Sequence, residues 1–358
     1  MDNVKEQKCK NCGAPLRFDP ESGLLVCDNC GTKTEIPAEL KESEVVVNGL
    51  DYNELAQQVT DENAENLPVY RCVSCSAEVI APAEQIATTC PYCGNNIVLT
   101  DKISGKLRPD GVIPFRIDKK HLPDAMNSFY KGKVLMPKRF FSESTMSKVT
   151  GVYVPFWIFS GRLDGVLRYH AESGTTHRNG DYLVTNTRHY EVRKHADLTF
   201  RDVPVDASGR IDDVLMDSLE PFDMADEKPF DMRYLAGFTA DRFDQAKSEV
   251  ADRAKNRMVN TVENTVLSSV LREYGAAYRT GGDLRAQLKA RYLLLPVYLF
   301  SIAYEGKDYE FAVNGQSGKV VGDVPTSKSV SAGYFGKRAG VVAAVIIGIF
   351  AIKYLLGA

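Results

Sequence analysis

Residues 9–30 have the sequence CKNCGAPLRFDPESGLLVCDNC, and residues 72–93 have the sequence CVSCSAEVIAPAEQIATTCPYC. Each segment has the pattern C-x2-C-x14-C-x2-C, and the second copy repeats the first at an offset of 63, from Cys9 to Cys72. Together the copies contain all eight cysteines of the chain. A repeated spacing of this kind indicates an internal duplication, and each copy is close to the pattern of a four-cysteine zinc site.

The spacing of the cysteines has a chemical reason. Two thiolates three positions apart on a tight turn can both face one ion, and a second turn from across a hairpin completes a tetrahedron. Three of the four turns continue into a glycine, which tolerates positive φ, and the fourth continues into a serine: Gly13, Gly31, Gly94 and Ser76. We therefore predict two zinc ribbons, residues 1–38 and residues 67–100, each with one structural Zn²⁺. The predicted ligands are Cys9, Cys12, Cys27 and Cys30 in the first ribbon and Cys72, Cys75, Cys90 and Cys93 in the second.

Disulfides and redox-active dithiols are the alternatives to zinc. Disulfides require an oxidising compartment, and residues 1–10 are too polar for a signal peptide. A redox-active pair usually stands alone beside a βαβ unit, which four paired turns do not resemble. Four thiolates on one ion leave no position for a substrate water, so the predicted role of both ions is structural. A ribbon of about 30 residues is too short for a sufficient core, so the metal would supply most of its folding free energy.

The charge of the N-terminal region bears on what the ribbons bind. The whole chain has a net charge of −3, and residues 1–100 contain 7 Lys or Arg against 16 Asp or Glu. Eight of these acids lie in residues 39–66, which we interpret as an acidic linker. Binding to a nucleic-acid backbone depends on clustered cations, so nucleic-acid binding is possible but not favoured. A protein partner is the preferred prediction.

The C-terminal segment 339–358 contains a single charge, Lys353. A helix of this length spans about 30 Å, the thickness of the hydrocarbon core of a bilayer. The alternative is a buried C-terminal helix, which also suits the short uninterrupted apolar run 339–352. Apolar residues on every face of the helix favour a single transmembrane tail anchor, and so does the linker 327–338, which carries Lys337-Arg338 directly before the span.

The basic pair also predicts an orientation. Positive charge on the N-terminal side of the span places residues 1–338 in the cytoplasm, where thiols stay reduced for zinc. The predicted topology is a single-pass membrane protein whose bulk is cytosolic, with almost nothing beyond the membrane. Within the span, Gly340, Ala344 and Gly348 are spaced by four, a small-residue pattern through which two helices could form a homodimer.

Residues 101–326 form the predicted central domain. The sequence as a whole is 44% hydrophobic and 25% charged, which excludes wholesale disorder and a polytopic membrane protein. Aromatic and β-branched residues predict an antiparallel meander, with turns at residues 173–174 and 179–180 and strands at residues 151–159, 165–172, 182–193 and 197–205. After a break at Gly281-Gly282, further strands are predicted at residues 284–304, 308–313 and 319–321.

Helices are predicted at residues 119–131, with Asp118 as the N-cap, at residues 211–219 and at residues 241–273. In the longest of these, apolar residues recur every four positions, as is typical of a helix that lies on a sheet: Val250, Ala254, Met258, Val262, Val266 and Val270. The predicted fold class is therefore α+β: two N-terminal four-cysteine zinc ribbons, a central antiparallel-sheet domain with a long helix, and a C-terminal single transmembrane helix.

A second, weaker repeat lies within the central domain. Residues 155–160, PFWIFS, match residues 296–301, PVYLFS, in kind at an offset of 141. Proline removes a donor from a strand, so both positions predict a strand edge or a bulge. The central domain is thus predicted to contain two related β units.

Several stretches, taken together with the paired ribbons, resemble one family. The stretches are residues 102–115 (KISGKLRPDGVIPF), 151–157 (GVYVPFW), 216–223 (MDSLEPFD) and 313–319 (VNGQSGK). In this order they resemble the bacterial TFIIB-type zinc-ribbon-containing membrane proteins, and the resemblance covers nearly the whole chain. It implies ribbons at the front, a central body and a membrane tail, and it implies no established reaction.

Members of that family are sometimes labelled primosomal or replication-restart helicases. A helicase motor needs a Gly-rich loop that ends in Gly-Lys-Ser/Thr, and no Gly-Lys pair of this chain is followed by Ser or Thr. The sequence also lacks a nucleophile elbow, a zinc-protease helix and a Rossmann loop. We therefore predict that the protein is not an enzyme.

Two groups of polar residues in the central domain are candidate sites. The chain has five histidines: His121, His170, His177, His189 and His195. Strand alternation brings His177, His189 and His195 to one face only in a favourable register, so surface histidines are the preferred interpretation. The second group is a run of aspartates: Asp202, Asp206, Asp212, Asp213 and Asp217. Their spacing differs from that of an EF-hand loop, and a solvated helix start is preferred.

These observations favour a membrane-anchored, cytosol-facing zinc-ribbon scaffold that binds a protein partner. The alternative is a membrane-tethered regulator that binds nucleic acid through its TFIIB-like ribbons. An enzyme with its site in the central domain is the least favoured function.

Overall fold

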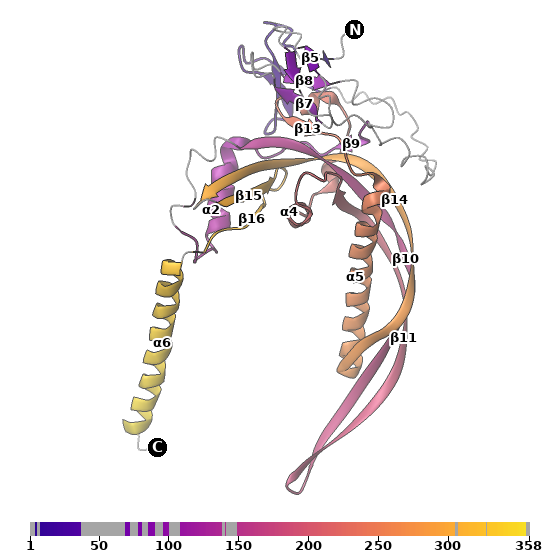
Figure 1. Cartoon of the computed structure of the whole chain (residues 1–358), viewed down its shortest axis with the longest axis vertical. Helices are drawn as coiled ribbons and strands as arrows, with labels where there is room; N and C mark the ends of the chain where they lie inside the picture. The colour runs from indigo at the N-terminus through magenta and orange to yellow at the C-terminus, as the bar shows by residue number, and fades with distance from the viewer. Residues whose placement is uncertain are drawn as a thin grey trace.

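The computed structural model describes residues 4–5, 8–36, 69–71, 78–80, 85–89, 96–99, 108–137, 140, 149–304, 307–326 and 328–355. Within these residues the chain is an α+β protein with a large, mostly antiparallel sheet, as the sequence predicts (Figure 1). The acidic linker 39–66 and residues 102–107 lie outside the described residues, and so do Cys72, Cys75, Cys90 and Cys93.

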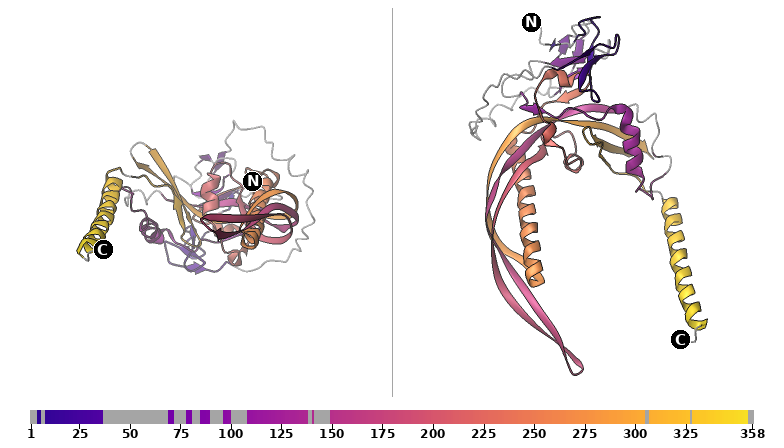
Figure 2. Two further views of the ribbon diagram at one scale, coloured as in Figure 1. Left: turned by 90° about the horizontal axis from the view of Figure 1, so that it is seen from below. Right: turned by 180° about the vertical axis from the view of Figure 1, so that it is seen from behind.

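Three very long strands form the centre of this sheet: β10 (Thr150–Asn179), β11 (Tyr182–Asp206) and β14 (Ala276–Tyr304). β10 pairs antiparallel with both of the others, and the three strands curve into an arch (Figure 1, Figure 2). The sequence predicts four shorter strands here. The predicted turn at residues 179–180 is confirmed, whereas the turn predicted at residues 173–174 is wrong, because Gly174 pairs with Thr187 and continues the ladder.

Two glycines permit the close approach of β10 and β14. Gly165 has φ +157°, and a Cβ there would lie 2.0 Å from the carbonyl oxygen of Asp283. Gly282 has φ +136°, and its Cβ would lie 2.5 Å from the carbonyl oxygen of Val166. Only glycine fits where the two backbones come this close. Gly282 therefore shapes the arch from within β14, whereas the sequence predicted a break between elements at this position.

The long helix α5 (Lys247–Tyr274) lies on the concave side of the arch (Figure 1). Its predicted apolar stripe is confirmed: five members are buried and Val266 is half-buried. The helix starts at Lys247 rather than at residue 241, because Thr239–Asp241 form the short strand β13. It ends at Tyr274 and is capped by Gly275, which has φ +91°.

The offset of 141, predicted from two short segments, extends to the strand pairing. β13 runs parallel to β10 with Thr239 opposite Val152, and β9 (Gly111–Val112) runs parallel to β14 with Gly111 opposite Leu293, where 152 plus 141 is 293. Further along the same two strands, Phe156 of β10 faces the last residue of β11. Val297 of β14 likewise faces the last residue of β15 (Lys307–Asn314). The difference between 156 and 297 is again 141.

The backbone hydrogen bonds repeat as well. The carbonyl oxygen of Pro155 accepts from the N–H of Ala207 at 2.9 Å, and that of Pro296 accepts from the N–H of Gly315 at 2.8 Å. Both prolines lie in central strands, at the point where a flanking strand begins or ends its pairing. The prediction of a strand edge therefore holds locally. The central domain contains two copies of a β-α-β-β unit, β9-α2-β10-β11 and β13-α5-β14-β15, with α2 at Leu122–Tyr130.

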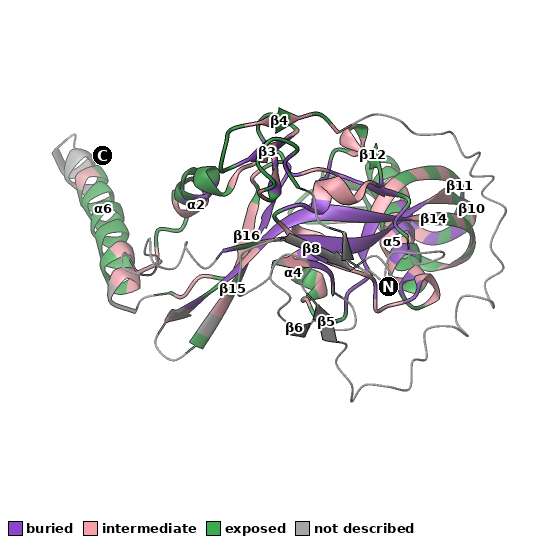
Figure 3. Cartoon of the chain, turned by 90° about the horizontal axis from the view of Figure 1, so that it is seen from above, coloured by how far each residue is buried: buried purple, intermediate pink, exposed green. Residues whose placement is uncertain are grey.

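The sheet is covered on its second face by α4 (Asp213–Ser218), which confirms the helix predicted at residues 211–219. Asp212 caps this helix, because its side chain accepts from the N–H of Leu215 at 2.8 Å. Met216, Leu219 and Phe222 pack against buried residues of β10 and β14, such as Phe156 and Leu295. Figure 3 shows the buried part of the sheet in purple, with α4 beside it. The helix predicted at residues 119–131 is also confirmed, as a 3₁₀ turn η3 (Lys119–His121) followed by α2.

The remaining strands of the large sheet are short: β1 (Val4–Lys5), β7 (Gln85–Thr89), β8 (Asn96–Leu99), β12 (Lys228–Pro229) and β16 (Val320–Gly322). Among the described residues, neighbouring strands follow the order β1-β8-β7-β13-β10-β14-β15-β16, while β11 pairs with β10 and β12 with β9. The β7–β8 hairpin belongs to the region predicted as the second ribbon. Pairing of β7 with β13 therefore joins that region to the central sheet.

The C-terminal helix α6 (Lys328–Leu355) includes a 20-residue window, Val330–Ile349, that is long and apolar enough to cross a membrane, and none of this window is buried. The segment 327–338, expected as a linker before the span, is helical from Lys328 onward. In Figure 1, α6 starts near α2 and its C-terminal end points away from the N-terminal region.

Candidate metal centre

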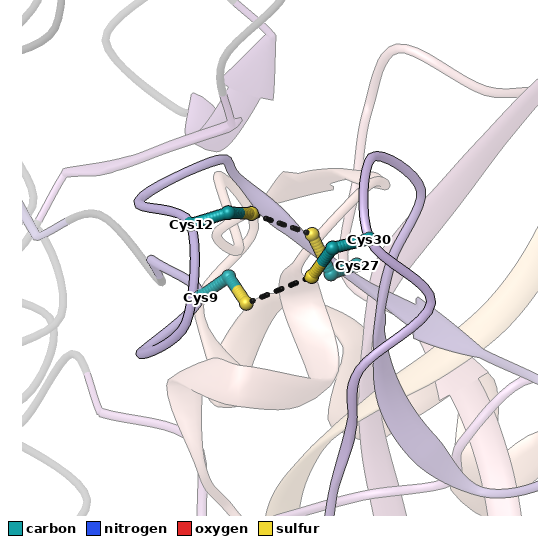
Figure 4. Close-up of side chains that lie close together, drawn as sticks. All are labelled: Cys9, Cys12, Cys27 and Cys30. Carbon is teal, nitrogen blue, oxygen red and sulfur yellow. Dashed lines mark hydrogen bonds between the residues drawn. The ribbon is translucent and has the colours of Figure 1, made fainter.

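The four cysteines of the N-terminal module, residues 8–36, converge in space. Their sulfur atoms all lie within 4.8 Å of one another and come from two separate turns (Figure 4). Cys9 Sγ lies 3.6 Å from Cys30 Sγ, and Cys12 Sγ lies 3.5 Å from Cys27 Sγ. Four sulfurs at about 2.3 Å from one zinc ion would be about 3.8 Å apart, so the set fits a tetrahedral ion.

The two turns have the same construction. In the first, Gly13 donates its N–H to the carbonyl oxygen of Cys9 at 2.9 Å, and in the second, Gly31 donates to that of Cys27 at 2.8 Å. The φ angles of Gly13 and Gly31 are +72° and +73°, which confirms the predicted role of these two glycines. Asn11 Nδ2 also donates to Thr32 Oγ1 at 2.9 Å and links the two turns. The backbone thus holds both cysteine pairs in position.

A three-stranded sheet carries the turns: β2 (Leu16–Asp19), β3 (Leu24–Cys27) and β4 (Lys33–Thr34). Its first two strands confirm the predicted hairpin between the cysteine pairs. The core of this module is small and includes two of the metal-binding candidates: Cys9, Leu16, Phe18, Leu25 and Cys27, closed by Ala236 of the central domain. Two thiols thus lie in the core, while those of Cys12 and Cys30 lie at the surface.

Hydrogen bonding and burial affect the thiols differently. The backbone N–H groups of Asn11 and Cys12 lower the pKa of Cys9 to about 6, and the N–H of Ala14 lowers the pKa of Cys12. The N–H of Cys30 acts in the same direction on Cys27, but burial and the neighbouring thiols outweigh it and raise the pKa of Cys27 to about 11. A divalent cation among the four sulfurs would deprotonate all of them, because a coordinated thiol ionises.

The N-terminal module is attached to the central domain. Phe18 donates its backbone N–H to the carbonyl oxygen of Ala236 at 2.9 Å, and its ring meets that of Tyr234 edge-on at 5.4 Å. The Glu21 carboxylate lies 2.7 Å from both Lys120 and His121, and Lys120 is the larger cause of a lowered pKa of Glu21. The module that carries the candidate metal centre therefore contacts the central domain through a backbone hydrogen bond, a ring contact and surface ion pairs.

The second cysteine quartet lies outside the described residues, but the strands that flank it are described. β5 (Val69–Arg71) pairs with β6 (Glu78–Ile80), on either side of the first predicted turn, with Arg71 opposite Glu78. The equivalent pair in the N-terminal module is Lys8 opposite Pro15, and adding 63 to 8 and 15 gives 71 and 78. Around the second turn, Thr89 faces Asn96 as Val26 faces Lys33, again at an offset of 63. The duplication read from the cysteines thus extends to strand register.

The histidines are arranged differently from the trio considered in the sequence. His170 and His189 lie together with Glu172, and their ligand atoms are all within 4.8 Å of one another. His177 and His195 pair with Val184 and Val166 and lie outside this cluster. His121 binds Glu21 at the base of the N-terminal module. The sequence analysis missed Glu172, which directly faces His189 across the hairpin.

The aspartate run is not a solvated helix start throughout. Asp212 is the cap of α4, but Asp206 is fully buried and pairs with Arg253 of α5. Arg253 also lies 2.5 Å from Asp213, and the neighbouring Arg257 binds Glu220 at 2.7 Å. The prediction is therefore wrong for Asp206, because the long helix brings two arginines to the end of β11.

Burial raises the pKa of Asp206 to about 6, even though Arg253 lowers it. Since the folded-state pKa exceeds the unfolded value, the contribution of this group to stability is present in acid. It is lost as the pH rises from about 4 through about 6. At neutral pH the folded protein therefore holds a buried carboxylate whose charge is balanced by Arg253.

Replacing Arg253 with methionine is expected to lower the free energy of unfolding by about 3–5 kcal/mol, because the buried Asp206 carboxylate would lose its counter-charge. The double variant Arg253→Met/Asp206→Leu should recover most of this loss. Urea unfolding of the detergent-solubilised chain, followed by the fluorescence of its only tryptophan, Trp157, measures both. Arg272→Met, an exposed arginine of the same helix, is the control and should change stability by less than about 0.5 kcal/mol. Equal losses in the Arg253 and Arg272 variants would contradict the prediction.

Two stretches that carry the family resemblance meet beside this network. Asn314 Nδ2 donates to the carbonyl oxygen of Leu219 at 3.1 Å, and Gln316 Nε2 donates to that of Asp223 at 2.9 Å. Gln316 Oε1 in turn accepts from the N–H of Asp223 at 2.7 Å. Residues 314–318 form a turn, since the N–H of Asn314 donates to the carbonyl oxygen of Lys319 at 2.9 Å. These buried polar groups bind one another, so they hold the fold together.

Comparison with known proteins gives one long relative. A protein of Bacillus subtilis (strain 168), described as the uncharacterized protein YdjG, is 33% identical over 333 residues, which cover 93% of this chain and 94% of that protein. No protein-family model matches the chain. No solved structure matches it either.

Proposed function

Since this chain belongs to the family that includes YdjG of Bacillus subtilis, we propose that its members are membrane-anchored, cytosol-facing scaffolds whose zinc ribbons bind a protein partner. The observation that carries the proposal is the four-cysteine cluster, whose four sulfurs could fill a tetrahedral site and whose small core includes Ala236 of the central domain. A tetrahedral zinc ion held by four thiolates has no position for a substrate. Such a centre has a structural role: it stabilises the fold of a binding surface and does not take part in catalysis.

Zinc is the ion that we assign to the N-terminal module, since tetrahedral tetrathiolate sites are typical of structural zinc. A second zinc ion is proposed for Cys72, Cys75, Cys90 and Cys93. Its support is the shared offset of 63 between the strand pairs that flank each turn in the two copies. Two structural ions per chain would agree with the resemblance to TFIIB-type zinc-ribbon-containing membrane proteins.

The membrane part of the proposal rests on α6. We assign residues 339–358 as a single membrane span with Lys337-Arg338 on its cytosolic side, following the positive-inside tendency. The reduced thiols that zinc requires support the same orientation. Gly340 and Gly348 have open space around them, so the small-residue face that they form with Ala344 is free to pack against a second copy. In the right-hand view of Figure 2 the N-terminal module and the C-terminal end of α6 lie toward opposite ends of the molecule.

Reversing two exposed charges of the N-terminal module, Lys10→Glu and Lys33→Glu, is expected to reduce partner recovery at least about tenfold, the effect of losing about 1.4 kcal/mol of binding. The measurement is chemical cross-linking of the full chain in cells, followed by purification in detergent and quantitative mass spectrometry. Neither lysine is a metal candidate, so zinc content should stay at the wild-type level.

The matched control is Lys255→Glu/Arg272→Glu, which reverses two exposed charges of α5 and should leave recovery unchanged. Absence of any stoichiometric protein from the wild-type sample would contradict the proposal. An equal loss of partner recovery in this control would contradict the proposal that the partner binds to the ribbons. Recovery that nuclease treatment abolishes would instead support the nucleic-acid alternative.

A further inference from the structure

The β10–β11 hairpin extends beyond the rest of the arch. β14 stops pairing with β10 at Glu172, which faces Ala276, and α5 ends at Tyr274. Beyond this point, residues 173–188 form a two-stranded arm, which projects past the end of α5 in Figure 1. An isolated pair of strands is only marginally stable in water. The arm therefore needs support where it leaves the three-stranded part of the sheet.

Four polar residues occupy that boundary. Glu172 of β10 faces His189 of β11, and the next pair on the same face is His170 opposite Glu191. The residues between them point to the other side of the sheet, since Ala171 is buried and Tyr190 packs against Tyr274 of α5. The four side chains thus form a square on the face that is turned away from α5.

Three atoms of this square converge on one point. His189 Nδ1 lies 3.2 Å from His170 Nε2 and 3.2 Å from Glu172 Oε1, and the third distance, His170 Nε2 to Glu172 Oε1, is 3.6 Å. Ligand atoms that surround one ion at about 2.1 Å are about 3.0–3.4 Å apart. A proton on His189 Nδ1 could be donated to His170 Nε2 or to Glu172 Oε1, but not to both. A cation between the three atoms would contact all of them, so it satisfies this geometry better than one hydrogen bond.

The ring of His170 is held in the orientation that such an ion requires. Its Nδ1 lies 3.4 Å from Glu191 Oε1, and its ring lies against that of Tyr278 of β14, tilted by 36° with centroids 5.2 Å apart. A carboxylate beside Nδ1 favours the tautomer with the proton on that atom, which leaves the lone pair of Nε2 for a metal. Glu191 thus occupies the place of an outer partner that orients a ligating histidine.

We propose that His170 Nε2, His189 Nδ1 and Glu172 Oε1 bind one divalent transition-metal ion and that this ion clips β10 to β11 at the base of the arm. Two imidazoles with one carboxylate suit ions such as Zn²⁺ or Ni²⁺, whereas Mg²⁺ and Ca²⁺ favour oxygen ligands alone. Three protein ligands leave further positions for water or for a side chain of a bound protein. This site is separate from the cysteine centre and does not depend on the proposed scaffold function.

The test is calorimetric titration of Ni²⁺ into the full chain, purified in detergent without a histidine tag and with zinc in its cysteine centre. The wild type is expected to show one saturable Ni²⁺ site per chain. His170→Gln, His189→Gln and Glu172→Gln should each weaken binding at least about 100-fold, and Glu191→Gln about tenfold, as for the loss of an outer partner. Ni²⁺ should also slow amide exchange in residues 173–188 of the wild type but not of His189→Gln.

His177→Gln and His195→Gln are the controls, because both histidines are exposed on the same hairpin but lie outside the cluster. Both variants should bind Ni²⁺ like the wild type. Circular dichroism and unchanged cysteine-bound zinc confirm that each variant is folded. A wild type without saturable binding would overturn the proposal. Equal weakening by all the histidine variants would do the same, since it would show adventitious surface binding only.

Discussion

Replacing Cys27 with serine is expected to abolish metal binding by the N-terminal module and to unfold residues 8–36. Cys27 is fully buried, and together with Cys9 it belongs to the small core of this module. Structural zinc contributes about 10–16 kcal/mol to the folding of comparable small modules. No core of this size can replace such a contribution, so the loss should be complete rather than gradual. Contacts with the central domain, such as Phe18 with Tyr234, should be lost at the same time.

Zinc content per chain by inductively coupled plasma mass spectrometry, together with amide exchange in residues 8–36, measures this effect. The variant should contain one zinc ion fewer per chain and should exchange this segment at the rate of an unfolded peptide. Ala14→Ser introduces a serine beside Cys12 without removing a ligand and is the matched control. Retention of the full zinc content by Cys27→Ser would contradict the assignment of the centre. Disulfides among the four cysteines in freshly prepared protein would contradict it as well.

Cysteine spacing predicted that Cys9, Cys12, Cys27 and Cys30 lie together, because the geometry of a four-cysteine site is set locally along the chain. Two thiolates per turn and a glycine after each turn are properties of short segments, and Gly13 and Gly31 have the expected positive φ. The same is true of the stripe on α5, where a period of four residues is sufficient to identify the buried face. Local rules of this kind need no knowledge of distant contacts.

The arch could not be predicted in this way. Strand ends were placed at glycines, because glycine usually weakens a strand. In the structure, Gly165 and Gly174 lie inside β10, since neighbouring strands continue past them and supply hydrogen-bond partners. Likewise, Asp206 was assigned to solvent because the arginine that pairs with it is 47 residues further along the chain. Both errors come from contacts that link residues far apart in the sequence.

The cluster of His170, Glu172 and His189 depends on a contact between two strands, but this contact could have been predicted from the sequence. A two-residue turn at Gly180-Asp181 fixes the register of the hairpin. With Asn179 opposite Tyr182, paired residue numbers add up to 361, which places Glu172 opposite His189 and His170 opposite Glu191. The turn predicted at residues 173–174 would break this register, so it concealed the pairing of Glu172 with His189.

Replacing Ile346 and Ile347 of α6 with glutamate is expected to move the protein from the membrane fraction to the soluble or aggregated fraction. Both side chains are exposed, and none of the apolar window of this helix is buried against the rest of the described chain. Each charge at the centre of a span costs about 2.5–3.5 kcal/mol. Two charges should therefore remove most of the gain from placing this helix in lipid. Extraction of membranes with alkaline carbonate, followed by immunoblotting, measures the distribution.

The control Ile346→Leu/Ile347→Leu keeps the hydropathy of the helix and should remain in the membrane fraction. The residues before the proposed span favour this outcome, because Tyr334 and Phe335 precede Lys337-Arg338 and the Arg338 guanidinium lies 4.7 Å from the centre of the Tyr334 ring. Aromatic and basic residues together are typical of the interface between lipid and water. If α6 instead bound a soluble protein partner, alkaline carbonate would extract the wild type from the membranes. The glutamate and leucine variants would then be found in the same fraction.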